Sequence, residues 1–514
     1  MYVRKKPNRS GSTSVVIVEK RNGKTYYLKT IGVSSDPKEI NDLYLQGKRW
    51  ISEQTRGLDM FIEQLRQDEE KLFVEGFLNK IEQILINGTQ LILNPIYKSI
   101  GFDKINDDVL KHLVVSRICQ PQSKVATSDY LKSYFDEDVD LNKIYRYLDK
   151  LSDTQKDNIQ EISVNHTREV LGGSIGVVFY YVTTLYFETD RDDELRKKGW
   201  YKDGKHSQPQ IVLGLLVSNG GYPLAYSIHE GNKYEGHTML PIIRDFVSKF
   251  DLKDFIIVAD SGLMNAENIK ELENKNYKYI IGARIKSEND VIKEWILSQK
   301  KVVGIFCDYQ KSEEQRLILA YTEQRARKDA INREKGIKRL EKEYEKGSIT
   351  KDKINKRGYN KFLKLTDKIN VEIDYTKIEE EAKWDGLKGY VTNTKLSGSE
   401  VCQQYSELWQ IERAFRVTKG VLDLRPMFHF TKKRIEAHVC ICFVAYKVYK
   451  ELERVLKKND INMSVDKVLS IAKTVTTIKV KLQESNETIS KTMLITDKHK
   501  SIAKLFENNF WHKV

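Results

Sequence analysis

Residues 174–283 carry the pattern that most constrains the fold, which is a series of short apolar runs separated by turn residues. Three consecutive runs, "IGVVFYYVTTLYFE", "PQIVLGLLVSN" and "YPLAYSIHEGN", predict strands, and a helix near 238–250 follows them. The strand "DFIIVADSG", the helix "NAENIKELENKNY" and the strand "KYIIGAR" complete the series. This order predicts an α/β sheet with an antiparallel side and a crossover.

Helical patterns surround this core. The Asn-Gly pair of "RNGK", between the apolar runs of 14–33, predicts a β-hairpin, and helical patterns follow it at 36–92 and 107–170. Such a region serves as a reader of DNA ends or as a spacer, and both interpretations stay open. Residues 322–365 predict two charged helices joined at "KGSIT", either a solvated hairpin or a DNA-contacting arm. The tail from about 440 predicts a core helix, "VCICFVAYKVY", and a hairpin at "TTIKVKLQESNETISKTMLIT".

Composition narrows the class of partner and the compartment. The formal charge of +14 favours a polyanionic partner, nucleic acid first, although a Lys-rich proteome would also produce it. The five cysteines show no CxxC spacing, so we expect a reduced, cytoplasmic setting. The basic start "MYVRKKPNRSGS" lacks the apolar segment of a signal peptide. No run approaches 18 apolar residues, so we expect no membrane span.

Two segments carry candidate chemistry. In "YSELWQIERAFRVTKG" (405–420), a helical reading places Glu412, Arg416 and Lys419 on one face, where the acid could hold a divalent ion and the cations could hold phosphates. Ordinary pairing of Glu and Arg on an exposed helix explains that spacing equally well. Asp260 ends the apolar strand "DFIIVADSG", and functional groups of open α/β sheets gather at such strand ends. An N-cap role would also place an aspartate there.

These residues resemble a known family. Tyr405, Glu412 and Lys419, each seven residues apart, resemble the Tyr-Arg-Glu-Lys signature of a branch of DDE transposases from bacterial insertion sequences. The segments "WDGLKGYVTNT" (384–394) and "VADSG" are similar to the family segments before the signature helix and around the second aspartate. "RICQPQSKVATSDYL" (117–131) and "RPMFHFTKKRIEAHVCICFVAY" (425–446) extend the resemblance over nearly the whole chain.

The resemblance implies an α/β fold: an RNase H-like catalytic core with an insertion before the last acidic residue. A mostly helical N-terminal DNA-binding region and a helical C-terminal region would flank it. We expect the following division: 1–106 hairpin and helices for recognition of DNA ends, 107–170 helices leading into the core, 171–290 first part of the core, 291–395 insertion with the charged hairpin, 396–450 last part of the core with the signature helix, and 451–514 C-terminal helices.

The resemblance also implies the site. Family members hold two Mg²⁺ ions, or Mn²⁺ as a substitute, with Asp, Asp and Glu; hard carboxylate oxygens suit these ions. Asp260 would be the second acid and Glu412 the third, both as metal ligands. Tyr405 and Lys419 would contact DNA, with Arg416 as a further cation on the same face. The partners implied are double-stranded DNA, as transposon ends and target, and a second copy of the chain on the DNA ends.

Two departures from the family stand out. The signature arginine belongs at position 408, where this chain has Leu408; Arg413 and Arg416 are nearby cations, but neither occupies that position. The first aspartate belongs one residue before "VTTLYFE", where this chain has Tyr181. Tyrosine is neutral at pH 7 because its ordinary pKa is about 10, so one of the three charges of the site is missing.

Neighbouring acids do not replace that aspartate. Side chains alternate along a strand, so Tyr181 shares its face with Phe179, Thr183, Leu185 and Phe187. Glu188 and Asp190 lie at odd offsets from Tyr181 and therefore point to the opposite face of a regular strand. We therefore predict an intact fold that binds DNA, with strand cleavage absent or strongly impaired.

The remaining polar groups divide into structural and DNA-facing candidates. His429 and His438 lack further ligands at zinc spacing, so structural or phosphate-facing roles are expected. A compact basic patch follows the signature segment, where neutralisation of the DNA backbone and plain solvation are both open. Its members are Lys432, Lys433 and Arg434.

Three hypotheses follow. The first is a transposase that recognises terminal inverted repeats and moves its own element by metal-dependent strand cleavage and transfer. The second is a catalytically silent DNA-binding protein descended from such an enzyme. The third, a nuclease or RNase H-like processing enzyme, is weaker because the signature segment and the insertion favour transposition.

Overall fold

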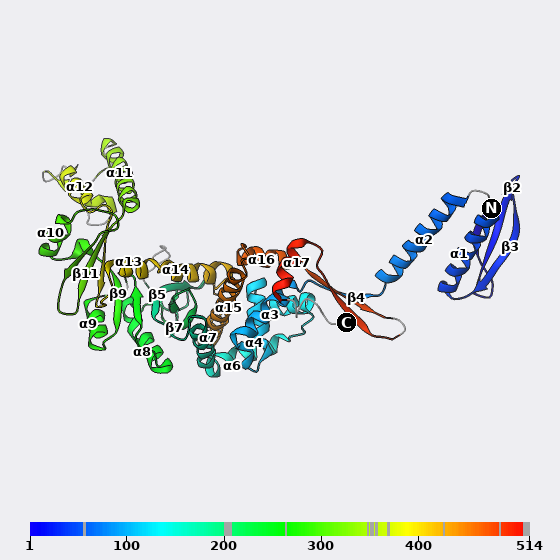
Figure 1. Cartoon of the computed structure of the whole chain (residues 1–514), viewed down its shortest axis with the longest axis horizontal. Helices are drawn as coiled ribbons and strands as arrows, with labels where there is room; N and C mark the ends of the chain where they lie inside the picture. The colour runs from blue at the N-terminus through cyan, green and yellow to red at the C-terminus, as the bar shows by residue number, and fades with distance from the viewer. Residues whose placement is uncertain are drawn as a thin grey trace. The chain divides into compact units, whose positions relative to one another are not determined.

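The structure of the chain, a computed structural model, forms two compact units. It describes residues 1–54, 58–199, 208–262, 265–346, 349, 354, 358–366, 371–424, 427–482 and 485–506. The smaller unit combines Met1–Leu85 with Thr476–Met493. The larger unit combines Ile86–Val475 with the segment that begins at Leu494 (Figure 1). His206, in the segment "YKDGKHSQPQ" that is similar to a family segment facing the cleft, lies outside the described residues.

The larger unit is built on an eight-stranded mixed sheet with the order β10-β11-β14-β9-β8-β5-β6-β7. The central strands β5, β8 and β9 are parallel, and every other neighbouring pair is antiparallel. In chain order the strands are β5 (Val177–Tyr186), β6 (Gln210–Ser218), β7 (Pro223–Glu230), β8 (Ile256–Ala259), β9 (Lys278–Ala283), β10 (Phe306–Gln310), β11 (Arg316–Tyr321) and β14 (Leu387–Thr392). With α8 (Met239–Phe250) and α9 (Ala266–Asn274), this confirms the predicted α/β series and is consistent with an RNase H-like core.

Strand β5 separates two hydrophobic cores because its side chains alternate between the faces of the sheet. Val178, Tyr180 and Val182 pack in a core that includes apolar residues of α8. Phe179, Leu185 and Phe187 pack in the other core, with Tyr181 partly buried against it. The predicted face of Tyr181 is therefore confirmed.

Helix α15 (Lys432–Lys458) is the buried centre of the second core, as the sequence predicted for "VCICFVAYKVY". The helices predicted for 107–170 are confirmed, and α4 and α6 pack directly on α15. The surrounding helices are α3 (Gly88–Ile100), α4 (Asp108–Cys119), α5 (Lys124–Tyr130), a π-helical turn (Leu131–Phe135), α6 (Leu141–Thr154), α7 (Lys156–Val170), α16 (Val465–Ala472) and α17 (Asp497–Ala503).

The described residues between β11 and β14, which we call the insertion after the expected domain, are not part of the central sheet. The insertion consists of α11 (Glu323–Glu345), a 3₁₀ turn (Gly358–Phe362), β12 (Leu363–Leu365), β13 (Val371–Ile373) and α12 (Tyr375–Ala382). The first charged helix is thus confirmed. The second is wrong for 358–365, because Phe362 and Leu363 pack with Val371 and Leu340 in a small core that needs a strand pair there. Strands β10, β11 and β14, from the range 291–395, extend the central sheet instead.

The smaller unit contains two three-stranded sheets, with the orders β1-β2-β3 and β16-β15-β4. Its elements are β1 (Tyr2–Pro7), β2 (Thr13–Arg21), β3 (Lys24–Ser34), α1 (Pro37–Gln54), α2 (Leu58–Leu78), β4 (Ile81–Leu85), β15 (Thr476–Lys481) and β16 (Thr488–Met493). The predicted hairpin is confirmed, and Asn22 and Gly23 both have positive φ, as a tight hairpin turn requires.

The description of residues 1–106 as hairpin and helices is incomplete, because β1 and β4 were not anticipated. The C-terminal hairpin at 476–493 is confirmed, but β15 pairs with β4 near the other end of the chain. A sequence pattern does not identify such a distant partner. No helix among the described residues is both long and apolar enough to cross a membrane.

A buried carboxylate on α15 should make stability depend on acid pH. Burial raises the pKa of Glu451, but hydrogen bonds from Arg454 and His166 outweigh it and hold the pKa at about 2, against an ordinary 4.5. Stability from this group is therefore present above pH 4.5 and is lost as the pH falls towards 2. We expect Glu451→Gln to lower the free energy of unfolding at pH 7 by about 2–4 kcal/mol and to flatten its fall below pH 4.5, both measured by urea denaturation.

The matched control is Asp153→Asn, which removes the carboxylate of a half-exposed pair with Lys433. It should cost less than about 1 kcal/mol. Equal acid sensitivity of the parent and Glu451→Gln would contradict the assignment.

Candidate active site

The candidate site lies where the parallel strands β5 and β8 run side by side. Tyr180 is paired with Ala259 in the register of the two strands, so Tyr181 and Asp260 are the next residues in each strand direction. Asp260 directly follows β8, is exposed, and accepts a hydrogen bond from the backbone N–H of Ser261 at 2.8 Å. The structure thus places Tyr181, where the family resemblance implies the first aspartate, next to the predicted second acid, Asp260.

Glu412 completes the predicted set. It is exposed on α14 (Trp409–Arg416) and lines a cavity of about 460 Å³ together with Tyr181 and Asp260. Asp260 and Glu412 are the carboxylates among the described residues of its lining. Glu188 and Asp190, at the end of the first strand segment, are exposed and do not belong to that lining.

The signature segment is not the single helix that we expected. Helix α13 (Gly398–Ser406) ends before α14 begins, and a π-helical turn (Val417–Val421) follows α14. At the break, the N–H of Leu408 donates to the carbonyl of Tyr405, three residues back. Tyr405, Leu408, Ile411 and Phe415 are all buried, so the break keeps these apolar positions on the core while Glu412 faces the cavity.

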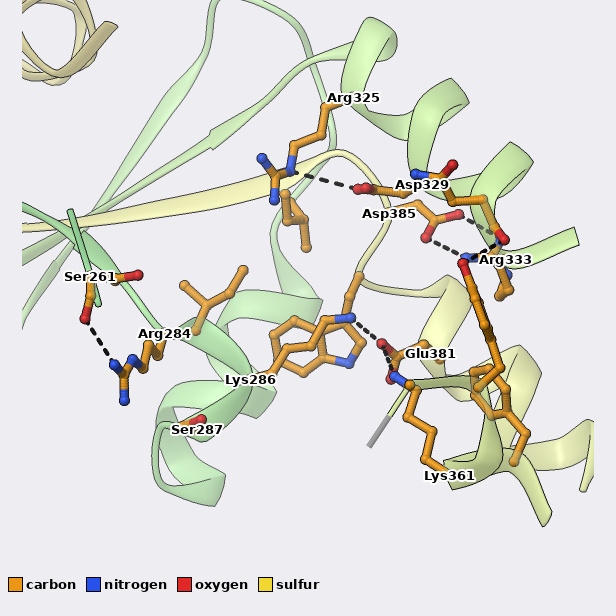
Figure 2. Close-up of a pocket in the computed structure, with 18 residues that line it drawn as sticks. Ser261, Arg284, Lys286, Ser287, Arg325, Asp329, Arg333, Lys361, Glu381 and Asp385 are labelled. Carbon is orange, nitrogen blue, oxygen red and sulfur yellow. Dashed lines mark hydrogen bonds and ion pairs between the residues drawn. The ribbon is translucent and has the colours of Figure 1, made fainter. Parts of the chain in front are cut away.

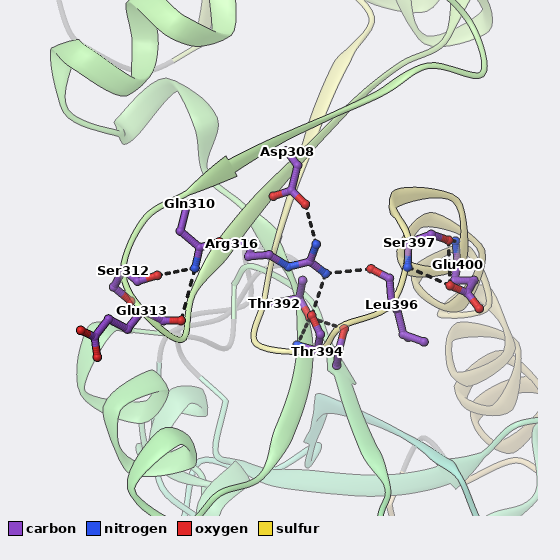
Figure 3. A network of polar contacts seen from close by, with 10 residues as sticks. All are labelled: Asp308, Gln310, Ser312, Glu313, Arg316, Thr392, Thr394, Leu396, Ser397 and Glu400. Carbon is purple, nitrogen blue, oxygen red and sulfur yellow. Dashed lines mark hydrogen bonds and ion pairs between the residues drawn. The ribbon is translucent and has the colours of Figure 1, made fainter.

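A network at the start of α13 fixes this segment. Figure 3 shows the Arg316 guanidinium of β11 donating to Asp308 of β10 and to the carbonyls of Thr394 and Leu396. Ser397 then caps α13 through reciprocal hydrogen bonds with Glu400. This half-buried arginine therefore connects two sheet strands to the loop that leads into the signature segment.

Tyr405 contacts the second acid directly. Its hydroxyl donates to Oδ1 of Asp260 at 3.2 Å, and its ring centroid lies 4.8 Å from that of Tyr390. Burial, followed by the charge of Asp260, raises the pKa of Tyr405, so the hydroxyl stays a neutral donor. A Cβ atom on Gly282 would lie 2.5 Å from this hydroxyl, so glycine is needed there. A DNA contact by Tyr405 stays a prediction.

Two cations that sequence reasoning missed line the same cavity. Lys388 of β14 lies 4.3 Å above the Tyr405 ring, and Arg325 comes from the insertion helix α11. Burial and the neighbouring Arg325 lower the pKa of Lys388, while Asp260 and Glu412 oppose that shift. Lys388 lies within "WDGLKGYVTNT", a segment that resembles the family, so the sequence offered a reason to select it. Arg325 was one of many charged residues on its helix, and nothing in the sequence distinguished it.

The predicted phosphate contacts have different surroundings. Lys419 donates to the hydroxyl of Thr183, on the face of β5 that carries Tyr181. Arg416 is exposed but does not line the cavity. Leu408 lines the cavity and is buried. Arg413 is paired with Glu453 at 2.5 Å and is therefore held away from the place of the signature arginine.

The basic patch of α15 packs against α6. Lys433 pairs with Asp153 at 2.6 Å and Arg434 with Asp149 at 3.3 Å, so two of the three cations hold these helices together; Lys432 is exposed. A role in DNA binding stays a prediction for all three. The rings of His429 and His438 have their centroids 5.2 Å apart and their planes tilted by 54°. Burial lowers both pKa values, that of His429 to about 4.

A second cavity, of about 750 Å³, adjoins the first and shares Ser261 and Arg325 with it. Figure 2 shows that acids of the insertion pair with most of its cations. Lys286 and Lys361 both contact Glu381, and Arg333 forms a two-pronged pair with Asp385. This cavity is therefore bound together by internal ion pairs.

The donor set does not fit a site of three carboxylates. Two carboxylates and a tyrosine occupy the three expected positions. Within the described ranges, no group of three His, Cys, Asp or Glu side chains is placed to hold a metal ion.

Comparison with known proteins identifies the family. The model of the transposase DDE domain matches residues 182–447, slightly more than half of the chain, so the chain belongs to the DDE transposase family. Members of this family carry out DNA transposition and generally use divalent metal ions. The match includes Asp260, Glu412 and Lys419 and begins one residue after Tyr181.

Among solved structures, the chain is similar to a piggyBac transposase in a synaptic complex with hairpin DNA. The identity is 9%, the match covers 79% of this chain and 77% of that one, and the TM-score is 0.39. No curated protein matches the sequence.

Substitution of Gly282 tests the position of Tyr405. Gly282→Ala places a methyl group against the Tyr405 hydroxyl, so we expect a loss of about 1–3 kcal/mol in unfolding free energy, measured by denaturation. Gly262→Ala is the matched control, because its Cβ would lie 3.7 Å from Asp260, an ordinary contact. Similar losses in the two variants would contradict the close approach of Tyr405 to Gly282.

Proposed function

We propose that this chain is a transposase that binds the terminal inverted repeats of its own insertion sequence, and that Tyr181 impairs its strand cleavage. One observation carries the proposal: Tyr181, Asp260 and Glu412 line a single cavity. Membership of the DDE transposase family supports the proposed activity, and the tyrosine at position 181 supports the proposed loss of cleavage. We further assign the chain to the branch with the Tyr-Arg-Glu-Lys signature, on the spacing of Tyr405, Glu412 and Lys419.

Tyr181 occupies its place stably. Its ring centroid lies 5.6 Å from that of Phe415, whose side chain is buried in the core beneath α14. The ring therefore fills space that a carboxylate would leave open, and it contributes apolar contact where the family places a negative charge. Loss of that charge weakens attraction for divalent cations, because carboxylate oxygens are the ligands that Mg²⁺ and Mn²⁺ prefer.

The remaining residues retain roles that need no third carboxylate. Asp260 and Glu412 would be the ligands of Mg²⁺ or Mn²⁺, which in this family supplies activation of the nucleophile and charge stabilisation. Tyr405 orients Asp260 by donating a hydrogen bond from its hydroxyl to Oδ1. Lys388, Arg325 and Lys419 bring positive charge to the cavity and its edge, where phosphates of the scissile strand would lie.

We also propose the arrangement of partners and domains. Residues 1–106 would recognise the DNA end, and two copies of the chain would hold two ends before target DNA is engaged. The insertion would comprise 323–386, because β10, β11 and β14 belong to the sheet. The alternative is a catalytically silent protein that binds the element ends without cutting them. The presence of Tyr181 beside Asp260 and Glu412 in the cavity favours this alternative as well.

Restoring the carboxylate should restore cleavage. We expect Tyr181→Asp to nick labelled element-end DNA in Mg²⁺ or Mn²⁺ at least about 100-fold faster than the parent chain, since each 1.4 kcal/mol of lost stabilisation costs tenfold in rate. Tyr181→Asp combined with Asp260→Asn is the matched control and should be inactive. Tyr181→Phe should resemble the parent.

Cleavage by the parent at the rate of Tyr181→Asp would sink the proposed defect. If both proteins bind the ends and neither cuts, Leu408 becomes the next position to restore, by Leu408→Arg in the Tyr181→Asp chain.

Metal affinity gives a readout that does not depend on cleavage. We expect Tyr181→Asp to bind Mn²⁺ at least about tenfold more tightly than the parent, because a third oxygen donor joins Asp260 and Glu412. Electron paramagnetic resonance titration of free Mn²⁺ measures this. Asp260→Asn in the Tyr181→Asp chain should abolish the gain, and an unchanged affinity in Tyr181→Asp would count against the metal-site assignment.

A further inference from the structure

The positive charge of the chain is concentrated at its N-terminal sheet. Residues 1–34 contain eight Lys and Arg residues and one acidic residue, Glu19. Their net charge of +7 is half of the +14 of the whole chain. Glu19 is paired with Arg21 at 2.7 Å, so the single acid neutralises a cation at the hairpin turn.

Helix α1 covers one face of the sheet β1-β2-β3 (Figure 1). Lys5 donates to Asn41 of α1, and the side chain of Val3 lies against Gly47 of the same helix. On β3, Lys29 lies over the ring of Trp50 at 5.3 Å. Odd-numbered residues of β1 therefore face α1.

The opposite face is open and basic. Because side chains alternate, Tyr2, Arg4 and Lys6 point away from α1. Val18 pairs with both Tyr2 and Tyr27, and the Lys6 ammonium lies 5.4 Å from the Tyr27 ring, which places Tyr27 on this face too. Lys20 follows Val18 on the same face of β2. We define the open face as Tyr2, Arg4, Lys6, Lys20 and Tyr27.

The side chains of the open face are accessible. Tyr2 and Tyr27 are 46% and 56% exposed, and the three cations are exposed as well. Val16 and Val18, between them on the central strand, are buried, so the flanking side chains cover the apolar floor. This produces a surface of cations and phenols over a rigid sheet, with no acid on the same face of β1.

We propose that the open face is a docking surface for duplex DNA at the element end. The inference rests on the proposed function and assigns its DNA-end contact to this sheet. Three strands spaced about 4.8 Å apart span about 10 Å, and the major groove of B-DNA is about 12 Å wide and admits β-ribbons. Arg4, Lys6 and Lys20 would neutralise phosphates, and the hydroxyls of Tyr2 and Tyr27 would donate to phosphate or base-edge acceptors.

The test compares two triple variants of the full chain. The first, Arg4→Gln with Lys6→Gln and Lys20→Gln, removes the cations of the open face. The matched control, Lys38→Gln with Arg66→Gln and Lys71→Gln, removes the same charge from exposed positions of α1 and α2. Fluorescence anisotropy measures Kd for a labelled duplex of about 30 bp from the element end and for a shuffled duplex of the same length. Each Kd is measured at NaCl concentrations from about 50 to about 300 mM, which gives the salt dependence of binding.

We expect the open-face variant to bind the end duplex at least about tenfold more weakly than the parent, and to lose about 2.7 from the slope of log K against log salt, or 0.9 for each phosphate contact. The control variant should change Kd by less than about twofold. Thermal melting by circular dichroism should show parent-like folding of both, because all six positions are exposed.

Three results would overturn the inference while the proposed function stands. The first is parent-like binding of the end duplex by the open-face variant, and the second is equal weakening in both variants. The third is tighter binding of the parent chain to phosphatidylserine vesicles than to the duplex, with that vesicle binding lost in the open-face variant. Failure of the parent itself to bind either duplex would instead overturn the proposed function.

Discussion

The parallel pairing of β5 with β8 is the constraint on which the site depends. It brings two strands that are about 80 residues apart in the chain into one register, with Tyr180 opposite Ala259, and so makes Tyr181 and Asp260 neighbours. The apolar side chains of β5 secure this pairing from both faces of the sheet. The third residue of the site depends on the same strand. Helix α14 packs its buried residues onto the face of the sheet at β5, and this places Glu412 at the cavity. Tyr181 therefore lies in an intact framework of paired strands and packed side chains.

Buried residues of the signature segment shape the site as much as its charged residues do. Its tyrosine is enclosed between Tyr390 and Lys388, and its hydroxyl reaches Asp260 only because position 282 has no side chain. Arg316 adds the second restraint by connecting β10, β11 and the loop before α13. Spacing alone would assign this tyrosine to a contact with DNA, whereas in three dimensions it supports the carboxylate of Asp260.

The core of the fold could be predicted because its signals are local. Alternation along 177–187 and the strand-helix-strand order of 174–283 depend on neighbouring residues, and the structure confirms both. The proximity of Asp260 and Glu412 was accessible only through family resemblance. The pairing of β4 with β15, the break at Leu408 and the approach of Arg325 depend on contacts between distant segments, so no local pattern announces them. The insertion strand β12 was misread because charged residues mask the two apolar residues that pack beneath α11.

The contact between Tyr181 and Phe415 has an evolutionary consequence. In the standard genetic code, tyrosine and aspartate codons differ only in their first base, thymine against guanine, so a single substitution separates the two states of this site. The tyrosine form keeps an aromatic contact with Phe415 that an aspartate at this position would lack. Under the proposed function, one base change at this codon would therefore convert a chain that lacks the first carboxylate into one that carries it, and the fold would stay in place.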